Sequence, residues 1–378
     1  MSKIHITLVG GQPVPTFIGV MDDNPDQIIL VHSSQSLPEA ENITKQIYDK
    51  LGKNCVKKEF NPFDFNSIRQ QIQELTTFFD ADEISVNITS GSKPWSILFY
   101  EYFSRKENAC VFFVDQQNKV WNVKTGESRR AKYTPTTLEI FTLNKTKLKD
   151  YFDFKNYKKE DFDVIPLIRN IRSKNVGAFH RITGLFHENP GGNYQEDPYG
   201  YSSIKWDKES NTYLCEIYGD RYGSGKDVFD VSSPNIEKLM LNTGWFELEV
   251  AQFLSDWSLA KEIWLNCIFA GTSSSSINPQ NEIDIIVKTE DKILFVECKT
   301  QIYNITDIDK YNNAVKNYGG LAAKRIFMTD KNCKYDAKVK FEQLEMPFFS
   351  LQDLKRDCRK RNEFYDFLNK MINESNKK

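Results

Sequence analysis

The sequence is short of the features that mark membrane, disulfide-rich or zinc-binding proteins. None of its apolar runs, in 378 residues, approaches the length of a transmembrane helix. The seven cysteines are an odd number, are widely scattered and form no CxxC pair, so we expect neither a disulfide framework nor a cysteine zinc site. Histidine occurs only four times. We therefore expect a cytoplasmic protein with reduced thiols.

Two common nucleotide-binding motifs are also missing, and the charges nearly balance. The sequence contains neither GxxxxGK[ST] nor GxGxxG. The net charge is −2, so any contact with nucleic acid must come from a local patch rather than from the whole chain. Three Lys/Arg-rich segments are candidates for such a patch, with solvated helix faces as the alternative: Lys145–Lys159, Arg169–Lys174 and Lys355–Arg361.

Short apolar runs alternate with amphipathic segments up to about Lys145. A hydrophobic content of 40% and a charged content of 27% are typical of soluble globular proteins, and the length suits two or three domains. Strand–helix alternation with nearly continuous apolar strands predicts an α/β fold with a parallel, doubly wound sheet. Residues 121–123 and 138–143 suggest further strands that close this domain. The predicted parallel strands are Ile4–Val9, Gln27–His32, Asn54–Phe60, Glu83–Ile88 and Ala109–Val114.

Small and hydroxyl-bearing residues follow several of these strands. Gly10–Pro13 follows the first strand, Ser33–Ser36 the second, and Asn87–Pro94 the fourth. Ligands of such sheets bind at the carboxyl ends of the strands, and backbone N–H groups at helix N-termini favour anions. The alternative is that these are ordinary turn residues and helix caps.

The richest stretch chemically runs from Gly244 to Lys299. Asp284 lies in one apolar, β-branched run, and Glu297 and Lys299 end another. The residues between the two runs predict a hairpin turn, and alternation places Glu297 and Lys299 on one face. Carboxylate oxygens suit Mg²⁺ or Mn²⁺. Glu247, from a predicted helix upstream, could complete the shell of metal ligands Glu247, Asp284 and Glu297.

These residues resemble the PD-(D/E)xK nuclease superfamily. Asp284 corresponds to the D, Glu297-Cys298-Lys299 to the ExK, and Glu247 to the upstream helical acid. Ile283 stands where the motif has Pro. The resemblance implies a restriction-endonuclease-like C-terminal domain in which Glu247, Asp284, Glu297 and Lys299 are catalytic.

The N-terminal strand ends resemble the CARF domain, the cyclic-oligoadenylate sensor of type III CRISPR defence. The resemblance rests on Val-Gly-Gly-Gln-Pro after the first strand and Thr-Ser-Gly-Ser-Lys after the fourth. The family's ligand is a ring of adenylates on a two-fold axis, which implies an isologous homodimer. Carried over by position, the residues expected at the ligand are Gly11, Gln12 and Pro13 beneath it, Ser33, Ser34 and Ser36 on its rim, and Thr89, Ser90, Gly91 and Lys93 at ribose and phosphate groups.

Together the two halves are similar to the single-chain CARF nucleases. We expect a CARF domain over residues 1–145, a connector helix and loop-rich β subdomain over 146–232, and the nuclease domain over 233–378. The connector is expected to contain a long helical stretch, Asp161–Glu188.

The resemblance implies an endonuclease that needs Mn²⁺ or Mg²⁺ and is activated by cyclic tetra-adenylate. Its expected substrates are DNA, single-stranded or nicked supercoiled, and single-stranded RNA. The alternatives are a repair or restriction endonuclease that no cyclic nucleotide controls, and a sensor that binds nucleic acid without cutting it.

Overall fold

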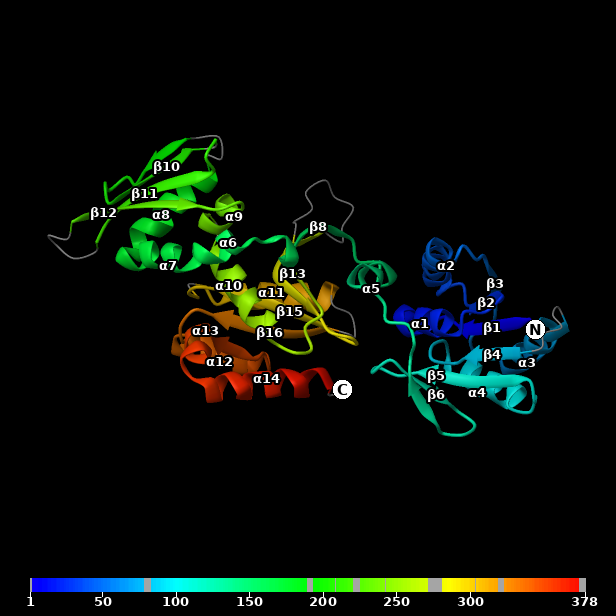
Figure 1. Cartoon of the computed structure of the whole chain (residues 1–378). Helices are drawn as coiled ribbons and strands as arrows, with labels where there is room; N and C mark the ends of the chain where they lie inside the picture. Colours follow the sequence, from blue (N-terminus) through cyan, green and yellow to red (C-terminus); the bar gives the residue numbers. More distant parts are fainter. Residues whose placement is uncertain are drawn as a thin grey trace.

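The chain folds into two α/β lobes that lie next to each other along the length of the molecule (Figure 1). The structure, a computed structural model, describes residues 2–77, 83–188, 193–207, 209–219, 225–241, 243–270, 281–302, 304–318 and 323–373. In these ranges no helix has the length and apolar character needed to cross a lipid bilayer.

The first lobe is built on a seven-stranded sheet of order β3-β2-β1-β4-β5-β6-β7. The first five strands in that order are parallel, and β6 and β7 extend the sheet as an antiparallel edge. The predicted doubly wound α/β fold is therefore confirmed. The strands are β1 (Lys3–Leu8), β2 (Gln27–His32), β3 (Cys55–Glu59), β4 (Glu83–Asn87), β5 (Ala109–Val114), β6 (Lys119–Asn122) and β7 (Ser128–Arg130).

Helices cover both faces of this sheet because its strands alternate apolar side chains between the two sides. Ile4, Ile6 and Leu8 of β1 pack with α3 and α4, whereas Ile28 and Leu30 of β2 pack with α1 and α2. The helices are α1 (Pro13–Asp23), α2 (Leu37–Leu51), α3 (Phe65–Thr77) and α4 (Lys93–Phe103).

The expected strand over residues 138–143 is wrong. This segment is helix α5 (Thr137–Leu143), which begins with a capping box between Thr136 and Glu139. Phe141 of α5 packs edge-on against Phe269 of the second lobe, with ring centroids 5.2 Å apart. The segment therefore lies between the lobes, since Leu143 packs with α1 and α2 of the first lobe while Phe141 packs on the second sheet.

The second lobe is built on a six-stranded sheet of order β17-β16-β15-β14-β13-β8. The neighbouring pairs β8–β13, β13–β14 and β14–β15 are antiparallel, whereas β15, β16 and β17 run parallel to one another. The edge strand β8 comes from the expected connector region and pairs with β13. The strands are β8 (Leu148–Asp153), β13 (Glu262–Phe269), β14 (Asn281–Lys288), β15 (Ile293–Lys299), β16 (Ala323–Thr329) and β17 (Phe348–Ser350).

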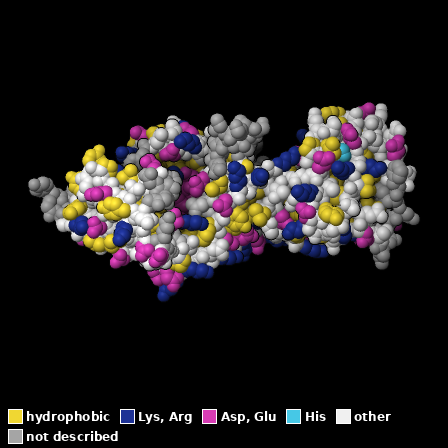
Figure 2. All heavy atoms as spheres, turned by 90° about the horizontal axis from the view of Figure 1, so that it is seen from above, with side chains coloured by type: hydrophobic (Ala, Val, Ile, Leu, Met, Phe, Trp, Pro, Cys, Tyr) yellow, Lys and Arg dark blue, Asp and Glu magenta, His cyan; other side chains and the backbone are white. Residues whose placement is uncertain are grey.

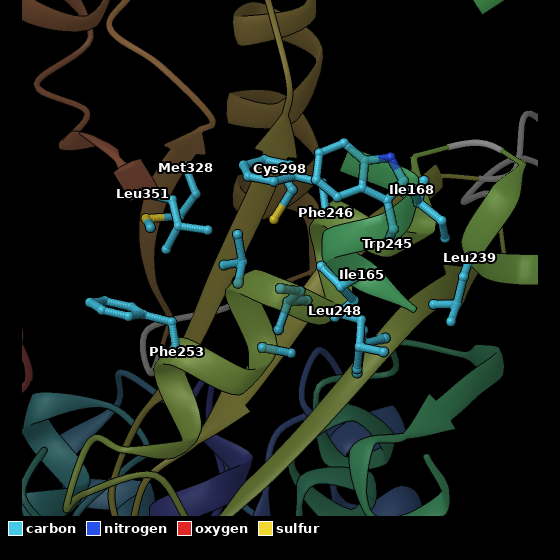
Figure 3. Packing of buried hydrophobic residues seen from close by; sticks show 14 of the residues in the cluster. Ile165, Ile168, Leu239, Trp245, Phe246, Leu248, Phe253, Cys298, Met328 and Leu351 are labelled. Atoms are coloured by element: carbon cyan, nitrogen blue, oxygen red, sulfur yellow. The ribbon is translucent and has the colours of Figure 1, made fainter. Parts of the chain in front are cut away.

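Two hydrophobic clusters cover the faces of the second sheet. Helices α7, α10, α13 and α14 share one cluster, and α5, α11 and α12 share the other. Figure 3 shows the first cluster, in which Trp245 and Phe246 of α10 lie among Ile165 and Ile168 of α7 and Cys298 of β15. The helices are α9 (Ile236–Met240), α10 (Gly244–Ser255), α11 (Thr306–Tyr318), α12 (Tyr335–Gln343), α13 (Leu351–Arg356) and α14 (Cys358–Asn373).

A small subdomain follows β8 and packs on the first of these clusters. Its antiparallel sheet has the order β12-β11-β10-β9. The expected long helix over Asp161–Glu188 is three helices, because Pro166 favours a new helix start and Asn175 is extended, with φ −154°. The elements are a 3-10 turn (Phe154–Asn156), α6 (Lys159–Asp163), α7 (Ile165–Lys174), α8 (Val176–Glu188), β9 (Tyr194–Glu196), β10 (Ser202–Asp207), β11 (Thr212–Tyr218) and β12 (Lys226–Ser232).

The two lobes meet at the turn between β14 and β15. Arg130 donates to both carboxylate oxygens of Asp291, at 2.8 and 2.9 Å, and Asn118 Nδ2 donates to Asp291 Oδ1 at 3.0 Å. The buried Lys292 donates through Nζ to the carbonyl oxygen of Gln116 at 2.9 Å. Polar contacts therefore hold the hairpin turn against the first lobe. Figure 2 shows the narrow waist between the lobes, with acidic and basic side chains interspersed on both.

Candidate active site

The start of helix α10 places Glu247. A Cβ at Gly244, the first residue of α10, would lie 2.1 Å from the backbone oxygen of Lys238, so only glycine permits this close approach. Glu247 then falls in the first helical turn, where its side chain is buried. Asn266 Nδ2 donates to Glu247 Oε2 at 2.8 Å and fixes the carboxylate toward the sheet.

The β14–β15 hairpin places the other three predicted residues. Lys299 Nζ lies 2.8 Å from Glu297 Oε1 and 3.6 Å from Asp284 Oδ2. The backbone N–H of Cys298 donates to Asp284 Oδ2 at 2.7 Å, while the Cys298 side chain points into the opposite core. The structure thus brings Asp284, Glu297 and Lys299 into contact at one end of the hairpin.

Two further residues belong to this cluster and were missed from the sequence. Glu282 lies two residues before Asp284 on the same strand, and its charge acts on both Glu247 and Glu297. The two-residue period of β14 could have pointed to it. Asn266 lies where the pairing of β13 with β8 shifts register, and its φ of 50° is left-handed. A bulge of this kind leaves no mark in the sequence that would have identified it.

Burial and mutual repulsion raise the pKa values of the acids. Burial, followed by the charges of Asp284 and Glu282, raises the pKa of Glu247 well above its usual value. Burial and the charge of Asp284 raise the pKa of Glu297 to about 8. Burial also raises the pKa of Asp284, outweighing the opposite effects of Lys299 and the Cys298 N–H.

The pKa of Lys299 is also raised, but by the charges of the neighbouring acids and against the effect of burial. Burial acts to lower its pKa, but the negative charges of Asp284 and Glu297 more than offset burial and raise it. The ammonium group therefore stays protonated, and it contacts both carboxylates.

The donor set fits a hard divalent cation. Four carboxylates, from Glu247, Glu282, Asp284 and Glu297, lie near one ammonium group, and burial is the main cause of their raised pKa values. A bound cation would favour their charged forms. Oxygen ligands of this kind suit Mg²⁺ or Mn²⁺. Among the residues that the structure describes, no group of three or more His, Cys, Asp or Glu side chains is arranged so that it could hold a metal ion, so the fit lies in the chemistry of the ligands.

An open pocket of about 300 Å³ adjoins the acids. Glu282, Glu297 and Lys299 form its sheet side, and Asp307 and Tyr311 of α11 form its helix side. The Tyr311 hydroxyl is engaged, since it donates to the backbone oxygen of Ile326 at 3.0 Å. The pocket gives an external group access to the acids.

The residues predicted to hold a cyclic oligoadenylate lie on loops at the carboxyl edge of the first sheet. The loops after β1 and β4 touch: a Cβ at Gly10 would lie 2.6 Å from the backbone nitrogen of Gly91 and 2.9 Å from Ser90 Oγ. Gly91 has a φ of +86°, which favours glycine. Lys93 is exposed at the start of α4, after the cap residue Ser92.

The hydroxyl groups of this edge differ in their availability. Thr89 Oγ1 donates to Asn87 Oδ1 and accepts from the Val114 N–H at 2.7 Å, so it is engaged within the fold. Ser33 is buried and Ser36 Oγ accepts its N–H at 3.0 Å, whereas Ser34 is exposed.

The loop after β1 also faces the second lobe. Gly11, Gln12 and Pro13 line a cavity of about 160 Å³, together with Asp291 and Lys292 of the β14–β15 turn. Three of the residues predicted beneath the ligand therefore lie next to the hairpin that carries Asp284 and Glu297.

Comparison with known proteins supports the assignment of the N-terminal domain and of the fold. Residues 4–151 match the family model described as the Card1 CARF domain. A search of curated protein sequences finds no match. Among solved structures, Can2 from Sulfobacillus thermosulfidooxidans, in complex with cyclic tetra-adenylate, aligns over 98% of this chain and 100% of its own, with a TM-score of 0.68 and 17% identity.

Two further solved structures share the fold. VC1899 from Vibrio cholerae aligns over 96% of this chain and 98% of its own, with a TM-score of 0.72 and 14% identity. A type III CRISPR defence DNA nuclease activated by cyclic oligoadenylate aligns over 88% of this chain and 46% of its own, with a TM-score of 0.55 and 11% identity. The CARF resemblance found in the sequence is thus confirmed for the N-terminal part of the chain: residues 4–151 match the Card1 CARF domain model, and 98% of the chain aligns with the fold of Can2.

Proposed function

We propose that this chain is a divalent-metal-dependent endonuclease of type III CRISPR defence that cyclic tetra-adenylate activates. The observation that carries the proposal is the meeting of Glu247, Asp284, Glu297 and Lys299 at one end of the β14–β15 hairpin. The CARF domain over residues 4–151 and the fold shared with Can2, a structure that contains cyclic tetra-adenylate, support the regulatory half.

The side chains divide the chemistry of phosphodiester hydrolysis between them. Glu247, Asp284 and Glu297 would hold the cation, which when bound polarises the phosphodiester and lowers the pKa of a water molecule. Lys299 stays protonated, so it acts as a donor: it orients the attacking water or offsets the negative charge that develops on the phosphoryl oxygens. The buried carboxylates strengthen these interactions by excluding bulk water.

Regulation requires that the activator bind the active state more tightly than the idle state. A near-complete switch needs a preference of about 10⁴-fold, or about 5.5 kcal/mol. We propose that two copies of the chain share one symmetric ring through their carboxyl-edge loops. Lys93→Ala should then raise the activator concentration needed for half-maximal cleavage, and an unchanged dose response would remove Lys93 from the ligand site.

One assay tests the function as a whole. The protein is incubated with Mn²⁺ and single-stranded DNA, supercoiled DNA or single-stranded RNA, with and without cyclic tetra-adenylate. Cleavage only in the presence of the ring supports the proposal. Equal cleavage without it would indicate a repair or restriction enzyme, and binding without cleavage under every condition would indicate a non-catalytic sensor.

A further inference from the structure

A second hollow in the nuclease lobe is lined by basic residues that the proposed chemistry does not use. It is a groove of about 740 Å³ between α7, the segment after β16 and helix α13. Two of the three Lys/Arg-rich segments singled out in the sequence meet there, since Arg169 and Arg172 line one side and Arg356 lines the other. Lys331 adds a fourth basic side chain.

The groove reaches the same edge of the second sheet as the candidate active site, although α7 and α13 cover the sheet face opposite to α11, which lines the pocket beside the acids. Thr329, at the end of β16, is paired with Lys299, and the N–H of Asp330 donates to the backbone oxygen of Lys299 at 3.3 Å. Neighbouring strands lie about 4.8 Å apart. Asp330 lines the groove, so its nearest wall is one strand away from the lysine of the acid cluster.

Part of the charge in the groove is already balanced. Arg169 contacts Glu249 and also donates to Asp330 at 2.5 Å, and Lys355 Nζ lies 2.6 Å from Glu249 Oε1. These four groups form a neutral network that ties α7 to α10 and to the end of β16.

The remaining charge in the groove is positive. Lys331 and Arg356 are exposed, and neither has an ion-pair partner among the residues that the structure describes. Among the described residues, the only other acid that lines the groove is Asp353, whose Oδ2 accepts from Asn332 Nδ2 at 2.9 Å. The pocket beside the acid cluster has more acids than bases by contrast, since Glu282, Glu297 and Asp307 line it together with Lys299 and Lys310. A polyanion would therefore find its counter-charges in the groove.

We propose that this groove binds the phosphodiester backbone of a single-stranded nucleic acid and directs it to the acid cluster. Arginine binds phosphate in a bidentate manner, and lysine binds it as a point charge. A single strand can bend along a concave groove, whereas a short duplex is stiff. The contacts are to phosphate, so binding is independent of base sequence. The inference rests on the proposed nuclease function and adds the path of the substrate.

The test compares two double variants that lose the same charge. Lys331→Ala/Arg356→Ala removes the two free cations of the groove. Lys261→Ala/Lys316→Ala removes two exposed lysines that lie before β13 and near the end of α11, at the other end of the sheet. Both are made in the full chain carrying Glu297→Gln, which prevents cleavage. Binding of a fluorescent single strand of about 12 nucleotides is measured by anisotropy at increasing salt.

We expect the groove variant to bind more weakly and its log–log salt slope to fall by about 1.4, because each phosphate contact on a single strand contributes about 0.7. The control variant should keep the original slope. On the active background, the groove variant should raise KM with little change in kcat. Equal slopes for both variants, or equally tight binding of a matched duplex, would overturn the proposal.

The two proposals fail in different ways. A protein that cuts single strands but shows the same salt slope in both variants refutes the groove and leaves the nuclease standing. A protein that binds strands through the groove and cuts none under any condition refutes the nuclease and leaves the groove standing. A protein that binds no strand at all overturns the groove.

Discussion

The buried Glu297 carboxylate lies near Asp284 and contacts the ammonium group of Lys299, so its removal should affect the chemistry of the acid cluster. Glu297→Gln keeps the shape of the side chain but removes the charge that would hold a cation and pair with Lys299. We expect activated cleavage to fall by at least about 10²-fold, the scale of losing one preorganised electrostatic contact, with affinity for cyclic tetra-adenylate unchanged. Gel-based cleavage and calorimetric titration of the ring measure the two quantities.

The control is Asp309→Asn, which removes a charge from a partly exposed residue of α11 that is paired with Lys340 at 2.9 Å. Its cleavage rate should stay within about two-fold of wild type, because exposed ion pairs contribute little. Full cleavage by the Glu297→Gln protein would show that the acid cluster has another role.

The raised pKa of Glu297 predicts how stability depends on pH when no metal is bound. Its folded pKa of about 8 lies above the ordinary value of 4.5, so between these limits the folded state holds a proton that the unfolded state has lost. Stability therefore falls as pH rises through this window, by at most about 1.4 kcal/mol per pH unit for one group. Urea unfolding between pH 5.5 and 8 with a chelator should show the decline. Glu297→Gln should make it shallower without abolishing it, because the pKa values of the neighbouring acids are raised too. A decline of the same slope in the variant would exclude Glu297 as its cause.

At the scale of single elements, the irregular part of β13 supports Glu247. Asn266 combines a left-handed backbone, with φ 50°, and a side chain that donates to Glu247. Asn266→Gly tolerates that backbone but removes the donor. A lost hydrogen bond to a buried carboxylate costs about 1–3 kcal/mol, so we expect roughly ten-fold slower cleavage and a small loss of stability.

Asn211→Gly is a matched control, because Asn211 also has a positive φ, of 51°, and donates to the backbone oxygen of Ser233 in the small subdomain. This variant should lose stability without losing cleavage. Equal activities for the two glycine variants would mean that the bulge has no part in positioning Glu247.

The elements also show what sequence reasoning can and cannot reach. The parallel strands of the first lobe and the β14–β15 hairpin were predictable, because their apolar runs and turn residues are local signals. Helix α5 and strand β8 were not, because their short segments take their form from packing and pairing with the second sheet, far along the chain. The two-residue period of β14 could have identified Glu282, whereas Asn266 is positioned by a bulge that the sequence does not reveal.

At the scale of the whole molecule, the β14–β15 hairpin joins the two proposed functions. Its turn contacts Arg130 and Asn118 of the CARF domain, and its other end carries Asp284 and Glu297. The loop after β1 and this turn line the same cavity. A movement of the loop on ligand binding would therefore change its packing against the turn. We propose that the hairpin is the physical link through which a ligand bound to the first lobe would bias the acid cluster.

Arg130→Ala tests this link. We expect ligand affinity to remain within about two-fold of wild type, while activation by the ring falls about 5–10-fold, the lower range of typical coupling energies. Arg105→Ala serves as the control, because it removes an exposed arginine that follows the C-cap of α4 and is paired with Glu101 of that helix. Full activation of the Arg130→Ala protein would show that the signal takes another route.

Strand β8 has a consequence for how the molecule can be divided. It is synthesised before the small subdomain, yet it borders the second sheet beside β13. A protein cut between the subdomain and α9 would leave β13 with bare backbone N–H and C=O groups, which recruit strands from other molecules. The second lobe thus cannot be isolated by cutting the chain at one point: β8, the strand that would protect it from self-association, stays on the N-terminal fragment.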